Sequence, residues 1–251
     1  MSRITQRGAT GPLSLVANGA FQTSTDASLA TMVGTRWDLA DGREVMLVSA
    51  GGTALAAGKL MQDAAVVPNH QNLATTAYVP YSANGNVPAS VTVTLGATAA
   101  TANQYAGGFV IVNDATGEGQ TVRIASHPAA DASATLKLTL EEDFTTAIVA
   151  ATTEVSLCTP HGKNVIIHPT TSTGAVAGVT LYPIAASAYG FVTTKGLTSA
   201  LNGAGTAAGL GLAPSGSTAG ALATVAATTN QVGYAAQAGV DTEYRAVFVN
   251  V

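Results

Sequence analysis

The sequence is short of charge. Only 10% of its 251 residues are Asp, Glu, Lys or Arg, against about 25% in an ordinary soluble domain, and the formal net charge is −4. Its ten Lys and Arg residues are scattered, so no basic patch of the kind that binds nucleic acid is expected. Gly, Ala, Thr and Ser dominate instead. A surface of such small, neutral side chains suits packing against other protein.

Long apolar runs and cysteine are also scarce. No stretch approaches the roughly 18 to 20 continuous apolar residues of a membrane span, so no membrane helix and no membrane partner are expected. Arg3 and Arg7 are not followed by an apolar region, so a secretory signal is not expected, and synthesis in cytoplasm is predicted. The single cysteine, Cys158, is predicted to be a small buried hydrophobe rather than a reactive thiol.

Helical periodicity is absent almost everywhere, whereas strand periodicity is clear in the middle of the chain. In Thr135–Glu141, leucines alternate with polar residues, which predicts a half-buried strand. Phe109–Val112 and Thr121–Ala125 lie on either side of a run of turn formers, which predicts a hairpin. With a further run at Glu154–Cys158, these segments predict a compact antiparallel β module over residues 87–168.

The segments on either side of the module are predicted to form one outer β domain, made of residues 36–86 and 169–251. Asp41-Gly42, between two strand-like pieces, indicates a hairpin. Residues 63–88 are predicted to be an irregular connection, because Pro and Asn-Gly interrupt them. Insertions favour surface loops, so the predicted fold class is all-β: a small outer β-barrel or sandwich interrupted by an inserted antiparallel module.

Residues 1–35 show neither the strand nor the helix period and are rich in Gly, Ala, Ser and Thr. They are predicted to form an extended N-terminal arm. Solvated disordered tails are usually charged or rich in proline, so the near absence of charge favours an arm that lies along a neighbouring subunit.

Catalytic and metal-binding motifs were sought and not found: there is no GxSxG, P-loop, HExxH or CxxC pattern. His161 and His168 are seven residues apart and would point to opposite faces of one strand, which argues against a shared metal site. All four histidines are predicted to be structural: His70, His127, His161 and His168. The sequence predicts no catalytic, cofactor-binding or metal-binding residue, no cofactor, no small-molecule substrate, and therefore no enzyme.

Three further features have a structural and a functional interpretation. Glu141-Glu142-Asp143 could chelate a cation, but three adjacent carboxylates at a strand end are more often a solvated turn. Residues Asn113–Gly119 lack the regular spacing of a calcium loop, and Gly117 and Gly119 precede no helix, so hairpin turn chemistry is preferred. The seven tyrosines form no periodic stripe; stacking platforms for sugars or bases stay possible beside core or interface anchors: Tyr78, Tyr81, Tyr105, Tyr182, Tyr189, Tyr234 and Tyr244.

Several turn-and-strand segments carry a likeness that covers most of the chain beyond residue 30. These segments are Gly34–Trp37, Asp41–Glu44, Ala54–Leu60, Ala102–Gly108, Gly117–Gln120, Leu212–Leu222, Val232–Ala235 and the ending up to Val251. Through them the sequence resembles the capsid decoration, or cement, proteins of tailed bacteriophages. The resemblance implies a β-rich subunit, often a homotrimer, on the outer surface of the virion capsid.

The resemblance also implies a function. The chain would be a non-enzymatic structural protein that binds the outside of a phage head, clamps neighbouring major capsid proteins and stabilises the capsid. The alternative is a phage tail-fibre or receptor-binding β module that recognises a sugar or a cell-surface protein. An exposed Trp or Tyr combined with carboxylates would favour that alternative. A bacterial surface or adhesin domain and an unrecognised hydrolase are weaker options.

Overall fold

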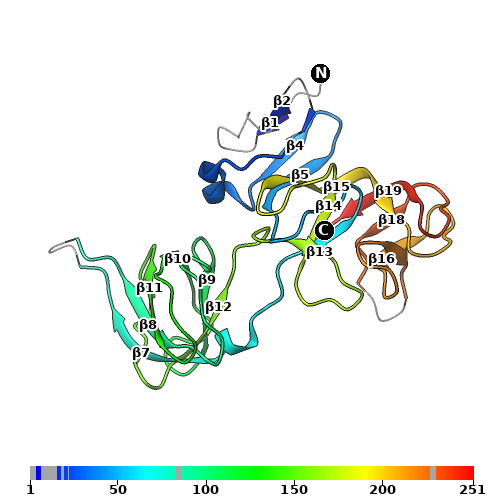
Figure 1. The fold of residues 1–251 in the computed structure, drawn as a ribbon. Helices are drawn as coiled ribbons and strands as arrows, with labels where there is room; N and C mark the ends of the chain where they lie inside the picture. The colour runs from blue at the N-terminus through cyan, green and yellow to red at the C-terminus, as the bar shows by residue number, and fades with distance from the viewer. Residues whose placement is uncertain (1–3, 7–15, 18–19, 22, 83–85, 227–229) are drawn as a thin grey trace. The chain divides into compact units, whose positions relative to one another are not determined.

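A computed structural model describes residues 4–6, 16–17, 20–21, 23–82, 86–226 and 230–251 of the chain. These residues are almost entirely β, which confirms the predicted fold class (Figure 1). The chain divides into two compact units. The outer unit comprises residues 1–65 and 161–251, and the inserted unit comprises residues 66–160.

The outer unit is built on an eleven-stranded sheet in which every strand pair described is antiparallel. Its main path runs through β1 (Ile4–Gln6), β4 (Arg36–Leu39), β5 (Glu44–Ser49), β15 (Tyr189–Leu201), β19 (Tyr244–Asn250), β18 (Gly233–Ala235), β16 (Gly211–Pro214) and β17 (Leu222–Thr224). Off this path, β6 (Leu60–Gln62) pairs with β13 (Ile166–Ile167) and β14 (Val176–Thr180). A separate two-stranded sheet joins β2 (Val16–Ala17) and β3 (Ala20–Phe21). The 13-residue β15 is central, since it pairs with β5, β14 and β19.

Alternation along β19 explains how this sheet forms its core. Val247 and Val249 are buried, whereas Phe248 and Asn250 are exposed. The buried side chains join a cluster with Leu212 and other apolar residues of the neighbouring strands. Burial of such clusters is the main favourable term in folding.

The predicted hairpin at Asp41-Gly42 is confirmed. β4 and β5 pair antiparallel, with Trp37 opposite Val45, and Gly42 takes the left-handed conformation that the turn requires (φ +83°). Trp37 is buried and packs edge-to-face on Phe191, with ring centroids 5.3 Å apart.

The predicted N-terminal arm comprises residues 1–35. Most of its first 22 residues lie outside the described residues. The part from residue 27 is not extended. Residues Ala27–Met32 form the 3₁₀-helix η2, and Leu29 on it is buried in a cluster with Trp37 and Phe191. The prediction is therefore wrong for residues 27–32, because one apolar side chain anchors that segment to the core of the outer unit.

The inserted unit is a closed six-stranded barrel, seen as a ring of strands in Figure 1. Its strands, in order around the barrel, are β10 (Thr121–Ser126), β11 (Thr135–Leu140), β8 (Ser90–Thr94), β7 (Leu73–Val79), β12 (Glu154–Cys158) and β9 (Phe109–Asp114). The predicted hairpin of β9 with β10 is confirmed, and so is the alternation of β11, whose three leucines are buried. Near the start of the unit lies the short 3₁₀-helix η3 (Pro68–His70).

The boundaries of the units differ from the predicted residues 87–168. The prediction of an irregular connection over residues 63–88 is wrong, because β7 pairs there with both β8 and β12 and so closes the barrel. β7 has few large apolar residues, and a register shift between Thr75 and Ala77 interrupts its alternation. At the other end, β13 pairs with β6 of the outer sheet, which places residues 161–168 in the outer unit.

Candidate functional site

Three large apolar side chains lie side by side on the solvent face of the outer sheet. Phe248 on β19 is directly opposite Leu197 on β15 and also directly opposite Tyr234 on β18. Residues opposite one another on antiparallel strands have Cβ atoms about 4.5–5.5 Å apart, so the three side chains are neighbours. We call Leu197, Phe248 and Tyr234 the apolar row. Their exposed fractions are 46%, 51% and 54%.

The face extends along β19 to Tyr244, which is 53% exposed. An aromatic side chain offers ~150–250 Å², so at about half exposure the apolar row and Tyr244 leave roughly 350 Å² of apolar surface in water. Apolar patches of about 300–600 Å² are the largest on a typical monomer, and they often have a function. Because three strands hold these residues in register, the patch is fixed by the fold.

Tyr244 lies against the turn that contains Gly58. A Cβ at position 58 would lie 2.7 Å from Cε1 of Tyr244, so any other residue there would push this ring aside. Gly58 also has a left-handed backbone (φ +65°), which glycine adopts without strain. The turn is held by the Gly58 N–H, which donates to the Thr180 carbonyl at 2.8 Å.

Two shallow hollows lie at this face, one bordering the apolar row at Leu197 and one bordering Tyr244. One, of about 460 Å³, includes Leu197 and Ala246 in its lining, and the other, of about 630 Å³, includes Gly58 and Tyr244. Arg43 borders both. Its Nε donates to Asp41 Oδ2 at 2.8 Å, and Nη2 lies 2.7 Å from the same oxygen. That hydrogen bond lowers the pKa of Asp41, and the ion pair leaves this border with little net charge.

This arrangement is suited to contact with another protein. The cores of protein interfaces are rich in aromatic residues and poor in charge, and the rims are polar. The apolar row supplies such a core, and the ion pair of Arg43 with Asp41 stands beside it. Among the residues that line the two hollows, the ionisable side chains are Asp41, Arg43 and Tyr244.

Two of the predicted structural histidines are buried in the inserted unit. Nδ1 of His70 is in short hydrogen-bond contact with the Tyr105 hydroxyl, and Nε2 of His70 lies 2.9 Å from the Thr98 carbonyl. The Tyr105 N–H donates to Nε2 of His127 at 3.0 Å, so Tyr105 links the two rings. Burial raises the pKa of Tyr105 to about 12, so this hydroxyl stays protonated.

The other two histidines belong to the outer unit and make separate contacts. His161 Nδ1 lies 2.7 Å from Asp63 Oδ2. His168 is buried, with Nδ1 2.6 Å from the Pro169 carbonyl and Nε2 3.0 Å from the Ser172 hydroxyl. Burial lowers the pKa of His168. Each of the four histidine rings thus has a polar contact with another residue of its own unit.

The remaining sequence candidates are dispersed. Glu141, Glu142 and Asp143 are all exposed after β11, and within the described ranges no group of three or more His, Cys, Asp or Glu could hold a metal ion. Asn113 and Asp114 are the last residues of β9, and residues 115–120 connect β9 to β10 as a turn. Cys158 is only partly buried, rather than fully as predicted, and burial raises the pKa of its thiol. No helix in the described part of the chain is long and apolar enough to cross a membrane.

The sequence contained part of the signal for the apolar row. Alternation over residues 245–251 already places Phe248 on the face opposite Val247 and Val249. It could not place Leu197 and Tyr234 beside Phe248, because those neighbours depend on strand pairing between distant segments.

No protein-family model matches the chain, no curated protein matches it, and no solved structure matches it.

Proposed function

We propose that this chain is a non-enzymatic structural virion protein that binds the outer surface of a phage head as a homotrimer. It would contact neighbouring major capsid proteins and hold them together. The likeness of the sequence to phage capsid decoration proteins supports this proposal. The single structural observation that carries it is the apolar row of Leu197, Phe248 and Tyr234 on the solvent face of the outer sheet.

The low charge of the chain fits the same proposal. With 10% charged residues, contact with another protein removes few charges from water, so the cost of desolvation is small. The row then contributes buried apolar area, at about 25 cal/mol per Å². Approximately neutral hollows beside the row leave shape and apolar contact as the main terms in binding.

The stabilising mechanism would be mass action. A subunit that binds only where capsid proteins are joined lowers the free energy of the joined state and leaves the separated state unchanged. The gain is about 2.7 kcal/mol per site when the free subunit is at 100 times its Kd. A head carrying many such sites would resist heat better than a bare head.

The proposal is tested by adding the purified protein to expanded and unexpanded heads of the phage whose genome carries the gene. We expect co-sedimentation with expanded heads, a higher temperature of head disruption, and a solution mass of three chains by light scattering. Absence of the protein from both kinds of head would contradict the proposal. Light scattering separates the two parts of the claim, since a monomer that binds heads would contradict only the homotrimer.

A further inference from the structure

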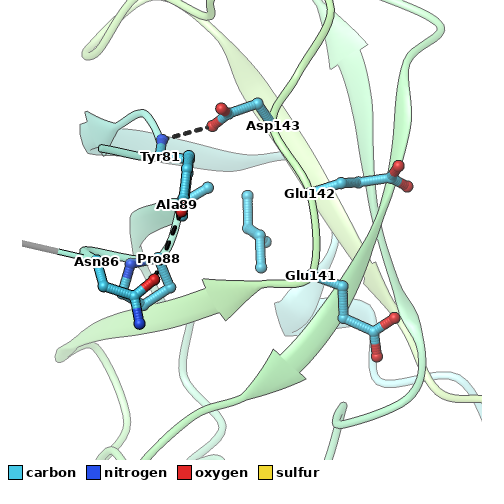
Figure 2. A pocket seen from close by; sticks show the side chains of 8 residues that line it. Tyr81, Asn86, Pro88, Ala89, Glu141, Glu142 and Asp143 are labelled. Atoms are coloured by element: carbon cyan, nitrogen blue, oxygen red, sulfur yellow. Dashed lines mark hydrogen bonds between the residues drawn. The ribbon is translucent and has the colours of Figure 1, made fainter. Parts of the chain in front are cut away.

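The inserted unit has a hollow of its own, of about 510 Å³, at the end of the β7–β8 hairpin (Figure 2). Small-molecule sites usually have volumes of about 300–1,000 Å³. Its lining comes from two segments, one directly before β8 and one that starts at the last residue of β11: Tyr81, Asn86, Pro88, Ala89, Leu140, Glu141, Glu142 and Asp143. The hollow is remote in sequence from the apolar row, and its interpretation does not depend on the proposed function.

The lining combines an apolar floor with an aromatic wall. Ala89 and Leu140 are buried and joined by a hydrogen bond, in which the Leu140 N–H donates to the Ala89 carbonyl at 2.8 Å. Tyr81 stands on one side of the hollow with Asn86, and 52% of its surface is exposed. The Tyr81 hydroxyl donates to Asn86 Oδ1 at 3.5 Å, and the ring offers a flat apolar face to a ligand.

Asp143 is held in a fixed position at the rim. Its Oδ1 accepts the Tyr81 N–H at 2.8 Å and the Tyr78 hydroxyl at 3.1 Å. Tyr78 is itself packed edge-to-face on Phe144, with ring centroids 5.5 Å apart. These two hydrogen bonds fix the Asp143 carboxylate at the rim of the hollow, and a fixed acceptor reduces the entropy that binding costs.

The two glutamates are not part of this acceptor set. Figure 2 shows the carboxylates of Glu141 and Glu142 pointing away from Tyr81. Glu141 is also 3.5 Å from Arg123 Nη1. A cation centred on three converging carboxylates is therefore not the ligand that this geometry fits.

The hollow thus presents an aromatic face, an apolar floor, a carboxylate acceptor and, on Asn86, an amide that both donates and accepts. A saccharide ring has the matching properties, since its C–H face is apolar and its edge carries hydroxyl groups. We propose that this hollow binds a neutral saccharide, with one ring stacked on Tyr81. Sugar hydroxyl groups donate to the Asp143 carboxylate and exchange hydrogen bonds with the Asn86 amide.

The proposal is tested by saturation-transfer NMR on the full chain with four probes: the methyl glycosides of glucose, galactose, mannose and N-acetylglucosamine. We expect transfer to the ring C–H protons of at least one probe. Tyr81→Ala should weaken that probe's Kd about five- to tenfold, because the stacked ring is lost. Tyr81→Phe should bind within about twofold of the unchanged chain, since the ring is kept.

Phe109→Ala is the matched control, because Phe109 is an exposed aromatic residue of the same unit that does not line the hollow. Its Kd should equal that of the unchanged chain. The proposal is overturned if none of the four probes receives saturation, or if Phe109→Ala and Tyr81→Ala weaken binding equally. It is also overturned if Nα-acetyl-lysine methylamide binds at Tyr81 while all four glycosides fail, since the site would then take a basic side chain by cation–π contact.

Discussion

Asp63 and His161 are 98 residues apart in the sequence, and their side chains meet in the outer unit with His161 Nδ1 2.7 Å from Asp63 Oδ2. The other carboxylate oxygen, Oδ1, accepts the backbone N–H of Gly162 at 2.8 Å. Asp63 directly follows β6, and His161 is the first residue of the returning segment of the unit. One carboxylate therefore joins the two segments of the outer unit at the point where its chain is interrupted.

Asp63→Ala should lower the free energy of unfolding of the outer unit by about 1–3 kcal/mol, because the buried Gly162 N–H loses its acceptor. Trp37 is the one tryptophan of the sequence and is buried in this unit, so its fluorescence in a urea titration measures the effect. The matched control is Asp41→Ala, which removes an exposed ion pair and should cost less than about 1 kcal/mol. Equal losses in the two variants would contradict the role given to Asp63.

Gly58→Ala should displace the Tyr244 ring and destabilise the outer unit by about 1–3 kcal/mol, since the new Cβ meets that ring and the left-handed backbone is strained. Gly52→Ala is the control. A Cβ there meets nothing within 4 Å, so that variant should keep or slightly raise stability. Urea titration followed by Trp37 fluorescence compares the two, and an unchanged midpoint for Gly58→Ala would show that the contact with Tyr244 is not tight.

His168 should make the stability of the outer unit fall in mild acid. Burial lowers its pKa below the ordinary value of 6.5, so below that pH the unfolded chain binds a proton that the folded chain does not. The contribution of neutral His168 to the free energy of unfolding is complete above pH 6.5 and is lost as the pH falls toward the lowered pKa. His168→Gln should reduce the change in the urea midpoint between pH 7.5 and about 5. A variant that keeps the full pH dependence would show that other groups cause it.

Arg245→Met should leave the free energy of unfolding unchanged or raise it by up to about 4 kcal/mol, because a buried charge without a partner is costly. Arg245 faces inward on β19 and is 5% exposed, and its three guanidinium nitrogens have no hydrogen-bond partner within the described ranges. Burial accordingly lowers its pKa. Leu212→Ala, in the neighbouring cluster, should cost about 2–5 kcal/mol in the same urea titration. A loss above about 1 kcal/mol for Arg245→Met would mean that the guanidinium makes a stabilising contact.

How far the sequence predicted the fold depended on how clearly each strand separates a buried face from an exposed one. β11 alternates leucines with polar residues, and β19 has valines at alternating positions, so both strands could be predicted from the sequence. β7 could not, because its inward positions include Thr75 and a register shift breaks the period. The hollow beside Tyr81 was equally hidden, because Tyr81 and Asp143 are 62 residues apart in the sequence and meet only in the folded chain.

The apolar row is the central claim, and co-sedimentation of a Phe248→Asp variant with expanded heads tests it most directly. Phe109→Asp is the control, because Phe109 is an exposed phenylalanine of the inserted unit. A carboxylate at the centre of a buried apolar contact is costly, so Phe248→Asp should reduce head binding at least about tenfold while Phe109→Asp binds normally. Normal head binding by a folded Phe248→Asp variant would contradict the account, because the apolar row would then not be the contact surface.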